Sequence, residues 1–257
     1  MNNLLFLPVY NCSSYISKLI NDLKKHNLKE ISEILIIDNK SLDNTVSTVI
    51  ESIKKIDLDK KITFIQNDEN VNLGGTHKVA LNYAKLKNFD YAIIFHGDYQ
   101  GSLADVEQII NQKKYYTFDF YLGSRFMKGS KLVNYSRLRI IGNYFFNFLF
   151  SLIAGKKISD LGSGLNVFKI KEVDFDIING FPNTLLFNYH LILYIIHFKK
   201  KYCFFPLHWS ESDQISNVKY ISHVVGMCKI LLSYFFNKTN FFVKEIYKYT
   251  YKIIYEK

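Results

Sequence analysis

Residues 91–100 read YAIIFHGDYQ, a short apolar run that gives way to a polar turn at His96. An apolar run of this length, bounded by turn residues, is typical of a buried strand. Alternate positions of an extended chain point the same way, so His96, Asp98 and Gln100 would share a side. A carboxylate fixed at a strand end can bind a divalent cation, which can in turn bridge a diphosphate. The competing interpretation is that Asp98 only caps a helix that begins near Ser102.

The same alternation of strand, turn and helix fills the first half of the chain. Apolar runs predict strands at residues 4–9, 34–37, 62–65 and 91–95. Between these runs, apolar residues recur at helical spacing, as at Ile16, Leu19, Ile20 and Leu23. Strands and helices that alternate in this way predict βαβ units and an α/β fold with a mostly parallel sheet. Ligands of such sheets bind at the C-terminal strand ends, where the polar residues of this chain would converge.

The second half is less regular, but its periodicity still predicts elements. Strands are expected at residues 120–122, near 167–170 and at 203–207, and helices at 136–152, 184–197 and 218–236. In the first half, Gly74-Gly75 predicts a tight turn at which the backbone could approach a phosphate. We expect one domain over residues 1–237 and a basic, aromatic tail over residues 238–257.

Composition narrows the class of protein. The 257 residues are 48% hydrophobic and 22% charged, which is typical of a folded globular chain. The net charge of +10 suits nucleic acid, anionic lipid or a phosphorylated substrate. The sequence contains no helix-turn-helix, zinc-finger or RNA-binding signature, so we expect no nucleic-acid partner.

Location is predicted from cysteines and hydropathy. Cys12, Cys203 and Cys228 form no CxxC pair, which fits a reducing compartment. The N-terminus reads as a strand and not as a signal peptide, and no apolar run is long enough to span a membrane. We therefore expect a cytoplasmic protein. The aromatic helix at 138–152 and the basic tail could attach it to an anionic membrane, or the helix could pack in the core.

Four motifs in order resemble family 2 glycosyltransferases of the GT-A fold. They are LPVYN at 7–11, IIDNKSLDNT at 36–45, NLGG at 72–75 and HGDYQ at 96–100. The later motifs LGSRF at 122–126, DLGSG at 160–164 and FPL at 205–207 look like the branch that includes dolichyl- and polyprenyl-phosphate sugar synthases. The form HGDYQ resembles a bacterial subgroup that acts in envelope polysaccharide synthesis. The resemblance spans roughly residues 4–237.

The resemblance implies a role for each matching position. Residues implied to bind the nucleotide sugar are Pro8, Tyr10, Asn11, Asp38, Asn39, Gly74, Asp98 and Arg125. Residues implied to hold a divalent metal, Mg²⁺ or Mn²⁺, are Asp98, His96 and Gln100. Arg137 and Ser163 would lie near the phosphate or acceptor, and Asp160 and then His190 are the candidate catalytic bases. The implied reaction inverts the anomeric carbon of a nucleoside-diphosphate sugar, with a polyprenyl-phosphate or glycan acceptor.

This chain departs from the family pattern at several of these positions. Asn39 stands where a second Asp is usual, His96 stands at the first acid of the DXD motif, and His190 stands where the family often has a Glu. These departures leave room for a catalytically impaired homologue that binds nucleotide or acts as a scaffold. A nucleotidyltransferase ranks lower because no glycine- and basic-rich loop follows the first strand. The sugar, the nucleotide, the acceptor and the oligomeric state stay open.

Overall fold

The computed structural model describes residues 1–211 and 220–257. The elements up to residue 112 are β1 (Asn3–Val9), α1 (Ser13–Leu23), β2 (Ile31–Asp38), α2 (Thr45–Lys55), β3 (Lys61–Asn67), α3 (Asn72–Leu86), β4 (Tyr91–Phe95) and α4 (Leu103–Gln112). They are followed by η1 (Lys114–Thr117), β5 (Phe120–Ser124), β6 (Lys131–Val133), α5 (Arg137–Ala154), β7 (Leu165–Lys169), η2 (Ile170–Glu172), α6 (Phe175–Asn179) and α7 (Phe187–His197). The last elements are β8 (Tyr202–Pro206), β9 (His208–Ser210), α8 (Tyr220–Phe236), η3 (Lys238–Asn240) and β10 (Tyr251–Glu256).

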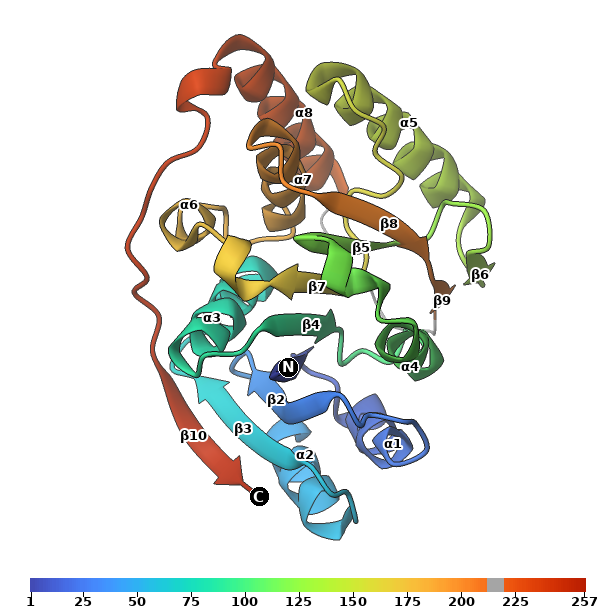
Figure 1. Cartoon of the computed structure of the whole chain (residues 1–257), viewed down its shortest axis with the longest axis vertical. Coiled ribbons are helices and arrows are strands. Elements are labelled where there is room, and N and C mark those ends of the chain that lie inside the picture. The colour runs from blue at the N-terminus through green and yellow to red at the C-terminus, as the bar shows by residue number, and fades with distance from the viewer. Residues whose placement is uncertain (212–219) are drawn as a thin grey trace.

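An eight-stranded sheet runs through the molecule in the order β10-β3-β2-β1-β4-β7-β5-β8 (Figure 1). Strands β1 to β4 pair in parallel, as do β5 and β8, whereas β7 is antiparallel to both of its neighbours. The strands β6 and β9 form a separate two-stranded sheet. The expected α/β fold with a mostly parallel sheet is confirmed.

Helices cover both faces of the large sheet and so create two hydrophobic cores. Successive side chains of a strand point to opposite faces. In β1, Leu5 and Leu7 therefore join the core beneath α1, α2 and α4, while Leu4 and Phe6 join the core beneath α3, α6 and α7. Because a strand buried on both faces has no polar side, its sequence reads as a continuous apolar run. This explains why the runs predicted β1 to β4 well.

Most of the predicted second-half elements are also present. The helix expected at 136–152 is α5, the strand expected at 203–207 is β8, and the helix expected at 184–197 begins three residues later as α7. The helix expected at 218–236 is α8, and the start that we predicted for it lies outside the described residues.

The turn predicted at Gly74-Gly75 is wrong, because both glycines lie in the first turns of α3. Their small size instead lets a distant loop come close. A Cβ on Gly74 would lie 2.6 Å from the carbonyl oxygen of Pro182. The Gly75 amide donates a hydrogen bond of 3.1 Å to the Asn183 carbonyl. The two glycines thus allow α3 to pack closely against the loop that contains Pro182 and Asn183.

The segment that we expected to be a tail contributes a strand to the sheet. β10 pairs antiparallel with β3, and Ile62 and Lys257 exchange two backbone hydrogen bonds of 2.9 and 3.0 Å. Before it reaches β3, the segment passes α6, where Gly180 lies directly against Val243 (Figure 1). Residues 251–256 are therefore built into the sheet of the preceding domain.

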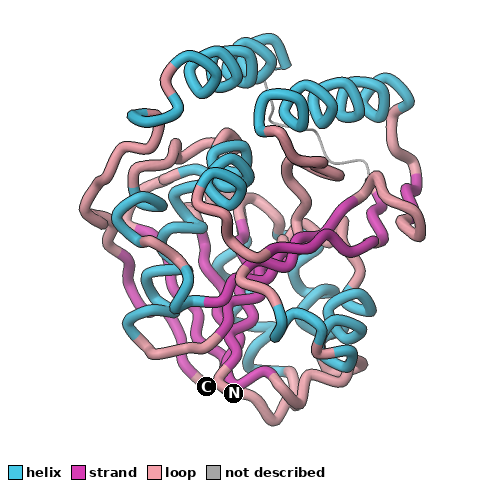
Figure 2. The backbone as a smooth tube through the Cα atoms, turned by 45° about the horizontal axis from the view of Figure 1, so that its top comes forward, coloured by secondary structure: helices cyan, strands magenta, loops and turns pink. Residues whose placement is uncertain are grey.

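Two long helices, α5 and α8, lie side by side on the outside of the molecule (Figure 2). Both leave large apolar side chains exposed, among them Phe148 of α5 and Phe235 of α8. Within residues 1–211 and 220–257, the structure contains no helix that combines the length and the apolar character needed to cross a membrane.

Gly180 offers a test of the contact between α6 and the C-terminal segment. Its φ of −77° suits any residue, but an added Cβ would lie 1.9 Å from the Val243 carbonyl oxygen. We expect Gly180→Ala to lower the free energy of unfolding by about 1–3 kcal/mol, as overpacking does. Urea unfolding measures this change.

The matched control is Gly142→Ala in α5, where an added Cβ would meet nothing within 4 Å. Ala favours a helix interior over Gly by up to about 1 kcal/mol, so this variant should be as stable as the parent or more so. Equal effects of the two substitutions would contradict the contact at Val243.

Candidate functional site

The C-terminal ends of β1, β2 and β4 are held together by backbone contacts. Val9 lies opposite Asp38 in the parallel register, and the Asn39 amide donates to the Val9 carbonyl at 2.9 Å. The Gly97 amide donates to the Pro8 carbonyl at 3.0 Å. A Cβ on Gly97 would lie 2.8 Å from that same Pro8 oxygen, so only glycine allows this approach. The predicted convergence of these strand ends is therefore present in the fold.

Asp38 is fully buried at the end of β2. One of its carboxylate oxygens, Oδ2, accepts hydrogen bonds from the Ser41 amide at 3.1 Å and from Gln66 Nε2 at 2.8 Å. Gln66, on the neighbouring strand β3, gives no sequence signal of its own, because its contact with Asp38 depends on strand order. The role of Asp38 in contacting a nucleobase stays a prediction.

The turn after β1 is fixed by Asn11, whose φ of 49° lies in the left-handed region that Asn tolerates. Its Oδ1 accepts from the Leu42 amide at 2.8 Å, and its own amide donates to Ser41 Oγ at 2.9 Å. Asn11 thus joins the loops that follow β1 and β2. The neighbouring Tyr10 is 37% exposed, and Asn11 is exposed as well.

Asn39 stands where the resembling family usually has a second Asp, and the structure gives a reason for the amide. Its Nδ2 donates to Asn70 Oδ1 at 2.9 Å. Its Oδ1 accepts from Asn67 Nδ2 at 3.1 Å and from the Val71 amide at 2.9 Å. A carboxylate cannot donate, so Asp would lose the bond to Asn70. Asn39 therefore braces the loop that leads into α3.

The loop after β4 is a turn rather than the extended segment that we predicted. β4 ends at Phe95, and Tyr99 has a φ of 59°. The Gln100 amide donates to Asp98 Oδ1 at 3.1 Å, and the Tyr99 hydroxyl donates to the carboxylate of Asp22 in α1. Extended geometry consequently does not place His96, Asp98 and Gln100 on one side. Tyr99 anchors the loop on α1 and presents Asp98 as a partly exposed carboxylate.

His96 turns toward the core and not toward the open edge. Its ring lies 5.7 Å from that of His77, and a Cβ on Gly164 would lie 3.0 Å from it. Burial lowers the pKa of His96, although the Asp98 charge acts in the opposite direction, and burial lowers the pKa of His77 well below the ordinary range. Both rings are therefore neutral, and His77 is a neighbour that sequence reasoning missed. A metal-binding role for His96 gains no support from this placement.

Arg125 and Asp160 form a buried, bidentate ion pair. Arg125 Nε donates to Asp160 Oδ2 at 2.9 Å, and Nη2 donates to Oδ1 at 2.8 Å. The Arg125 side chain is 12% exposed and that of Asp160 is fully buried. Burial acts to lower the pKa of Arg125, but the Asp160 charge raises it further than burial lowers it. The guanidinium also lies over the Trp209 ring at 5.6 Å.

This ion pair bears on two predicted roles. Asp160 accepts from Arg125 with both oxygens, and Oδ1 also accepts from the Gly162 amide at 3.0 Å, so the carboxylate is ill placed to act as a base. The Arg125 fork faces Asp160 instead of an open phosphate site. Ser163 is buried, with its hydroxyl donating to the Leu165 carbonyl at 3.1 Å. The loop 160–164 is thus held tightly at the edge where β7 begins.

The other two predicted residues lie apart from this edge. His190 lines a separate cavity beside Lys78, and burial lowers the pKa of His190 to about 4. Arg137 is exposed at the first residue of α5. Neither joins the group of Asp38, Asp98 and Asp160.

The strand-end edge concentrates negative charge. Burial raises the pKa of the Cys12 thiol to about 12, and the charges of Asp43, Asp38 and Asp98 all add to this rise. Across the described part of the chain, no three His, Cys, Asp or Glu side chains are arranged to hold a metal ion by themselves. One or two carboxylates together with substrate phosphates are a common way to bind Mg²⁺. Asp98 fits that arrangement, with a diphosphate supplying the remaining oxygens.

Comparison with known proteins identifies the family of this chain. Residues 5–173 match the model of Glycosyl transferase family 2. An uncharacterised protein of Methanocaldococcus jannaschii is 29% identical over 162 residues, which cover 63% of this chain and 62% of that protein. The UDP-N-acetylglucosamine–dolichyl-phosphate N-acetylglucosaminyltransferase of Methanococcus voltae is 26% identical over 173 residues, which cover 64% of this chain and 68% of that enzyme.

A solved structure supports the fold. The mannosyltransferase of Pyrobaculum calidifontis, in complex with GDP-Man and Mn²⁺, superposes with a TM-score of 0.58 and 15% sequence identity. The superposition covers 92% of this chain and 63% of that chain. This likeness shows that the two share the α/β architecture.

The ion pair of Arg125 and Asp160 can be tested through stability. Asp160→Ala leaves a buried guanidinium without its partner, so we expect the free energy of unfolding to fall by about 3–5 kcal/mol. Chemical denaturation measures this loss. The control is Glu51→Ala, which removes an exposed pair with Lys55 at 3.9 Å and should change stability little. If Asp160→Ala were as stable as the parent and yet inactive, this result would contradict a structural role and favour the predicted role of Asp160 as catalytic base.

Proposed function

This chain belongs to glycosyl transferase family 2, and on that premise we propose that it moves a sugar from a nucleoside-diphosphate sugar to a polyprenyl phosphate. A glycan acceptor is the alternative within the same reaction class. Support for the phosphate acceptor comes from the Methanococcus voltae relative, whose name gives dolichyl phosphate as acceptor. We further propose that the product serves envelope polysaccharide synthesis on the cytoplasmic side of the membrane.

The donor would bind at the ends of β1, β2 and β4. Tyr10 offers an exposed aromatic ring there, and Asp98 offers the accessible carboxylate. We propose that Asp98 holds a divalent cation together with the donor diphosphate, as the Mn²⁺ in the similar mannosyltransferase suggests. Such a cation, when bound, offsets the negative charge of the leaving diphosphate.

The position of the candidate bases favours a phosphate acceptor. Asp160 is held by Arg125 through both oxygens, and His190 lies in another cavity. A sugar hydroxyl needs a base within hydrogen-bond reach to take its proton. A phosphate is already anionic at neutral pH and needs none. With Asp98 assigned to the cation, the engagement of Asp160 by Arg125 and the distant place of His190 are the observations that support a phosphate acceptor.

The proposed reaction is a single displacement. A phosphate oxygen of the acceptor forms a bond to the anomeric carbon while the bond from that carbon to the diphosphate oxygen breaks. The anomeric centre inverts, no proton is transferred, and the nucleoside diphosphate leaves with the bonding electrons. The chain's own part is to hold the donor at the strand ends and to keep the loop at 160–164 rigid through the Arg125 ion pair.

The exposed surface of α5 and α8 suits attachment to an anionic membrane. On α5, the exposed residues Leu138, Ile141, Phe145, Phe148 and Leu152 recur at the spacing of one helix face. On α8, the exposed apolar residues are Ile221, Val224, Val225, Leu232, Phe235 and Phe236. Exposed basic residues stand at or near the ends of these helices, namely Arg137, Lys156, Lys157 and Lys238. Apolar and basic groups together are typical of interfacial binding.

Release of nucleoside diphosphate tests the enzymatic proposal. We expect release from one of a panel of UDP-, GDP- and dTDP-sugars in the presence of polyprenyl phosphate, with Mg²⁺ or Mn²⁺ and not with chelator. Asp98→Ala should reduce the rate at least 100-fold, which corresponds to about 2.7 kcal/mol of lost transition-state stabilisation. The control Asp57→Ala removes an exposed carboxylate elsewhere and should leave the rate unchanged.

Two outcomes would redirect the proposal. Full activity of Asp98→Ala would contradict the cation site. If no donor is turned over with any acceptor lipid, then the chain is a catalytically impaired homologue that binds nucleotide or acts as a scaffold.

Flotation with vesicles tests the membrane surface. The wild-type chain should float with vesicles that contain anionic lipid, and the double variant Phe148→Ser/Phe235→Ser should stay at the bottom of the gradient, because two exposed rings are lost. Leu86→Ser is the control, since Leu86 is 71% exposed and belongs to α3, a helix that Figure 1 shows apart from α5 and α8. Equal flotation of all three proteins would rule out this surface.

A further inference from the structure

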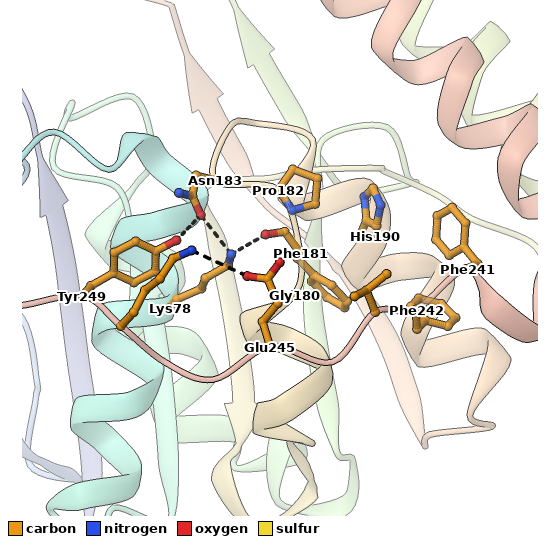
Figure 3. A pocket seen from close by; sticks show the side chains of 12 residues that line it. Lys78, Gly180, Phe181, Pro182, Asn183, His190, Phe241, Phe242, Glu245 and Tyr249 are labelled. Carbon is orange, nitrogen blue, oxygen red and sulfur yellow. Dashed lines mark hydrogen bonds and ion pairs between the residues drawn. The ribbon is translucent and has the colours of Figure 1, made fainter.

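A cavity of about 370 Å³ lies between α3, the loop 180–183, α7 and the C-terminal segment 241–249 (Figure 3). Its volume is within the range of sites that bind small molecules. The aromatic residues that line it are Phe181, Phe241, Phe242 and Tyr249. Asp98 and the other carboxylates of the strand-end edge are not part of its lining.

The cavity wall contains a buried cation without a carboxylate partner. Lys78 is 1% exposed, and its Nζ donates to the Phe181 carbonyl and, at 2.9 Å, to Asn183 Oδ1. Both acceptors are neutral. In the described part of the chain, no carboxylate oxygen comes within ion-pair distance of Lys78. Buried charges are normally paired, so this lysine points to an anion that is supplied from outside the chain.

The charges around Lys78 leave an excess of positive charge. Glu245 is the acidic residue that lines the cavity; it pairs with Lys248 at 4.0 Å, and its charge also acts on Lys78, where it opposes the lowering of the Lys78 pKa by burial. Asn183 is held in place by the Tyr249 hydroxyl, which donates to it at 2.6 Å, so Asn183 links the two sides of the cavity. Two lysines against one glutamate make the cavity suited to an anionic group.

His190 adds a hydrogen-bond acceptor on the far side. Its Nδ1 lies 3.2 Å from the Leu186 carbonyl, and because a carbonyl only accepts, Nδ1 carries the proton. Nε2 then offers a lone pair, which can accept from a hydroxyl group. The ring is stacked on Phe241, with centroids 4.9 Å apart, so its orientation is fixed.

We propose that this cavity binds a small phosphate monoester that also carries hydroxyl groups. Lys78 and Lys248 contact the phosphate, His190 accepts from a hydroxyl, and the aromatic rings cover the carbon skeleton. The site is separate from the one that binds the sugar donor. It explains why a lysine is buried in an aromatic setting and why a histidine occupies position 190.

Calorimetric titration at pH 7 tests the proposal with three probes, namely glucose 6-phosphate, inorganic phosphate and glucose. We expect glucose 6-phosphate to bind more tightly than inorganic phosphate, and glucose not to bind. Lys78→Met should weaken the binding of glucose 6-phosphate at least tenfold. Lys87→Met, an exposed lysine at the end of the same helix, should leave it unchanged.

Competition with UDP and a second variant, Lys248→Gln, provide two further tests of where glucose 6-phosphate binds. Saturating UDP should not displace glucose 6-phosphate; displacement would place the probe in the donor site and overturn the proposal, as would wild-type affinity in Lys78→Met. If that variant fails to fold, Lys248→Gln should weaken binding several-fold, since the Lys248 side chain is 70% exposed and dispensable for packing. Unaltered affinity in Lys248→Gln, or no binding of any probe to the wild-type chain, would contradict the site.

The pH dependence gives an independent readout. Burial lowers the pKa of Lys78 to about 8 and that of His190 to about 4. Since only protonated Lys78 attracts the phosphate, affinity should fall as the pH rises from 7.5 to 9.5, a range in which a phosphate monoester, with a second pKa of about 6, is almost entirely dianionic. Affinity that stays constant over this range would exclude Lys78 as the anion contact.

Discussion

The close approach of the loop after β4 to the end of β1 sets the position of the whole candidate site. Gly97 donates to the Pro8 carbonyl, and no larger residue fits at that distance. The contact requires β1 and β4 to be parallel neighbours in register, which in turn requires both to be buried between two helical layers. Asp98 stands one residue beyond this contact, so its place at the edge follows from the packing of the core.

Around this edge, the polar residues divide into those that bind each other and those that stay accessible. Asn11 and Asn39 connect one loop to the next, and Arg125 and Asp160 neutralise each other. Their hydrogen bonds make the edge rigid before any substrate arrives, which lowers the entropy that binding has to overcome. Tyr10 is exposed at this edge, and Asp98 is partly exposed while it accepts from the Gln100 amide. The edge is therefore a frame of mutually hydrogen-bonded loops with these two side chains at its surface.

Much of the fold follows from the sequence because β1 to β4 are buried on both faces and their apolar runs are unmistakable. The arrangement of the candidate site could be predicted from the sequence only in part. The motif around Asp98 predicted a polar loop at the end of β4, which is present, but the left-handed turn at Tyr99 depends on the contact with Asp22 in α1, which no local pattern encodes. Likewise, the partners of Asn39 lie about thirty residues along the chain. The sequence also did not indicate that His190 lines a separate cavity, because a helix position does not reveal which face of the sheet its side chain will meet.

The pairing of β10 with β3 determines when the edge of β3 is covered during synthesis of the chain. The ribosome releases the N-terminal strands first, and domains generally begin to fold during synthesis. β3 then has an open edge until residues 251–256 have been synthesised and have paired with it. Exposed edges are where strands of other chains add and aggregation starts. A nascent chain of this protein therefore depends on residues 251–256 to cover the edge of β3, and a chain cut short before residue 251 would carry a sheet with that edge unprotected.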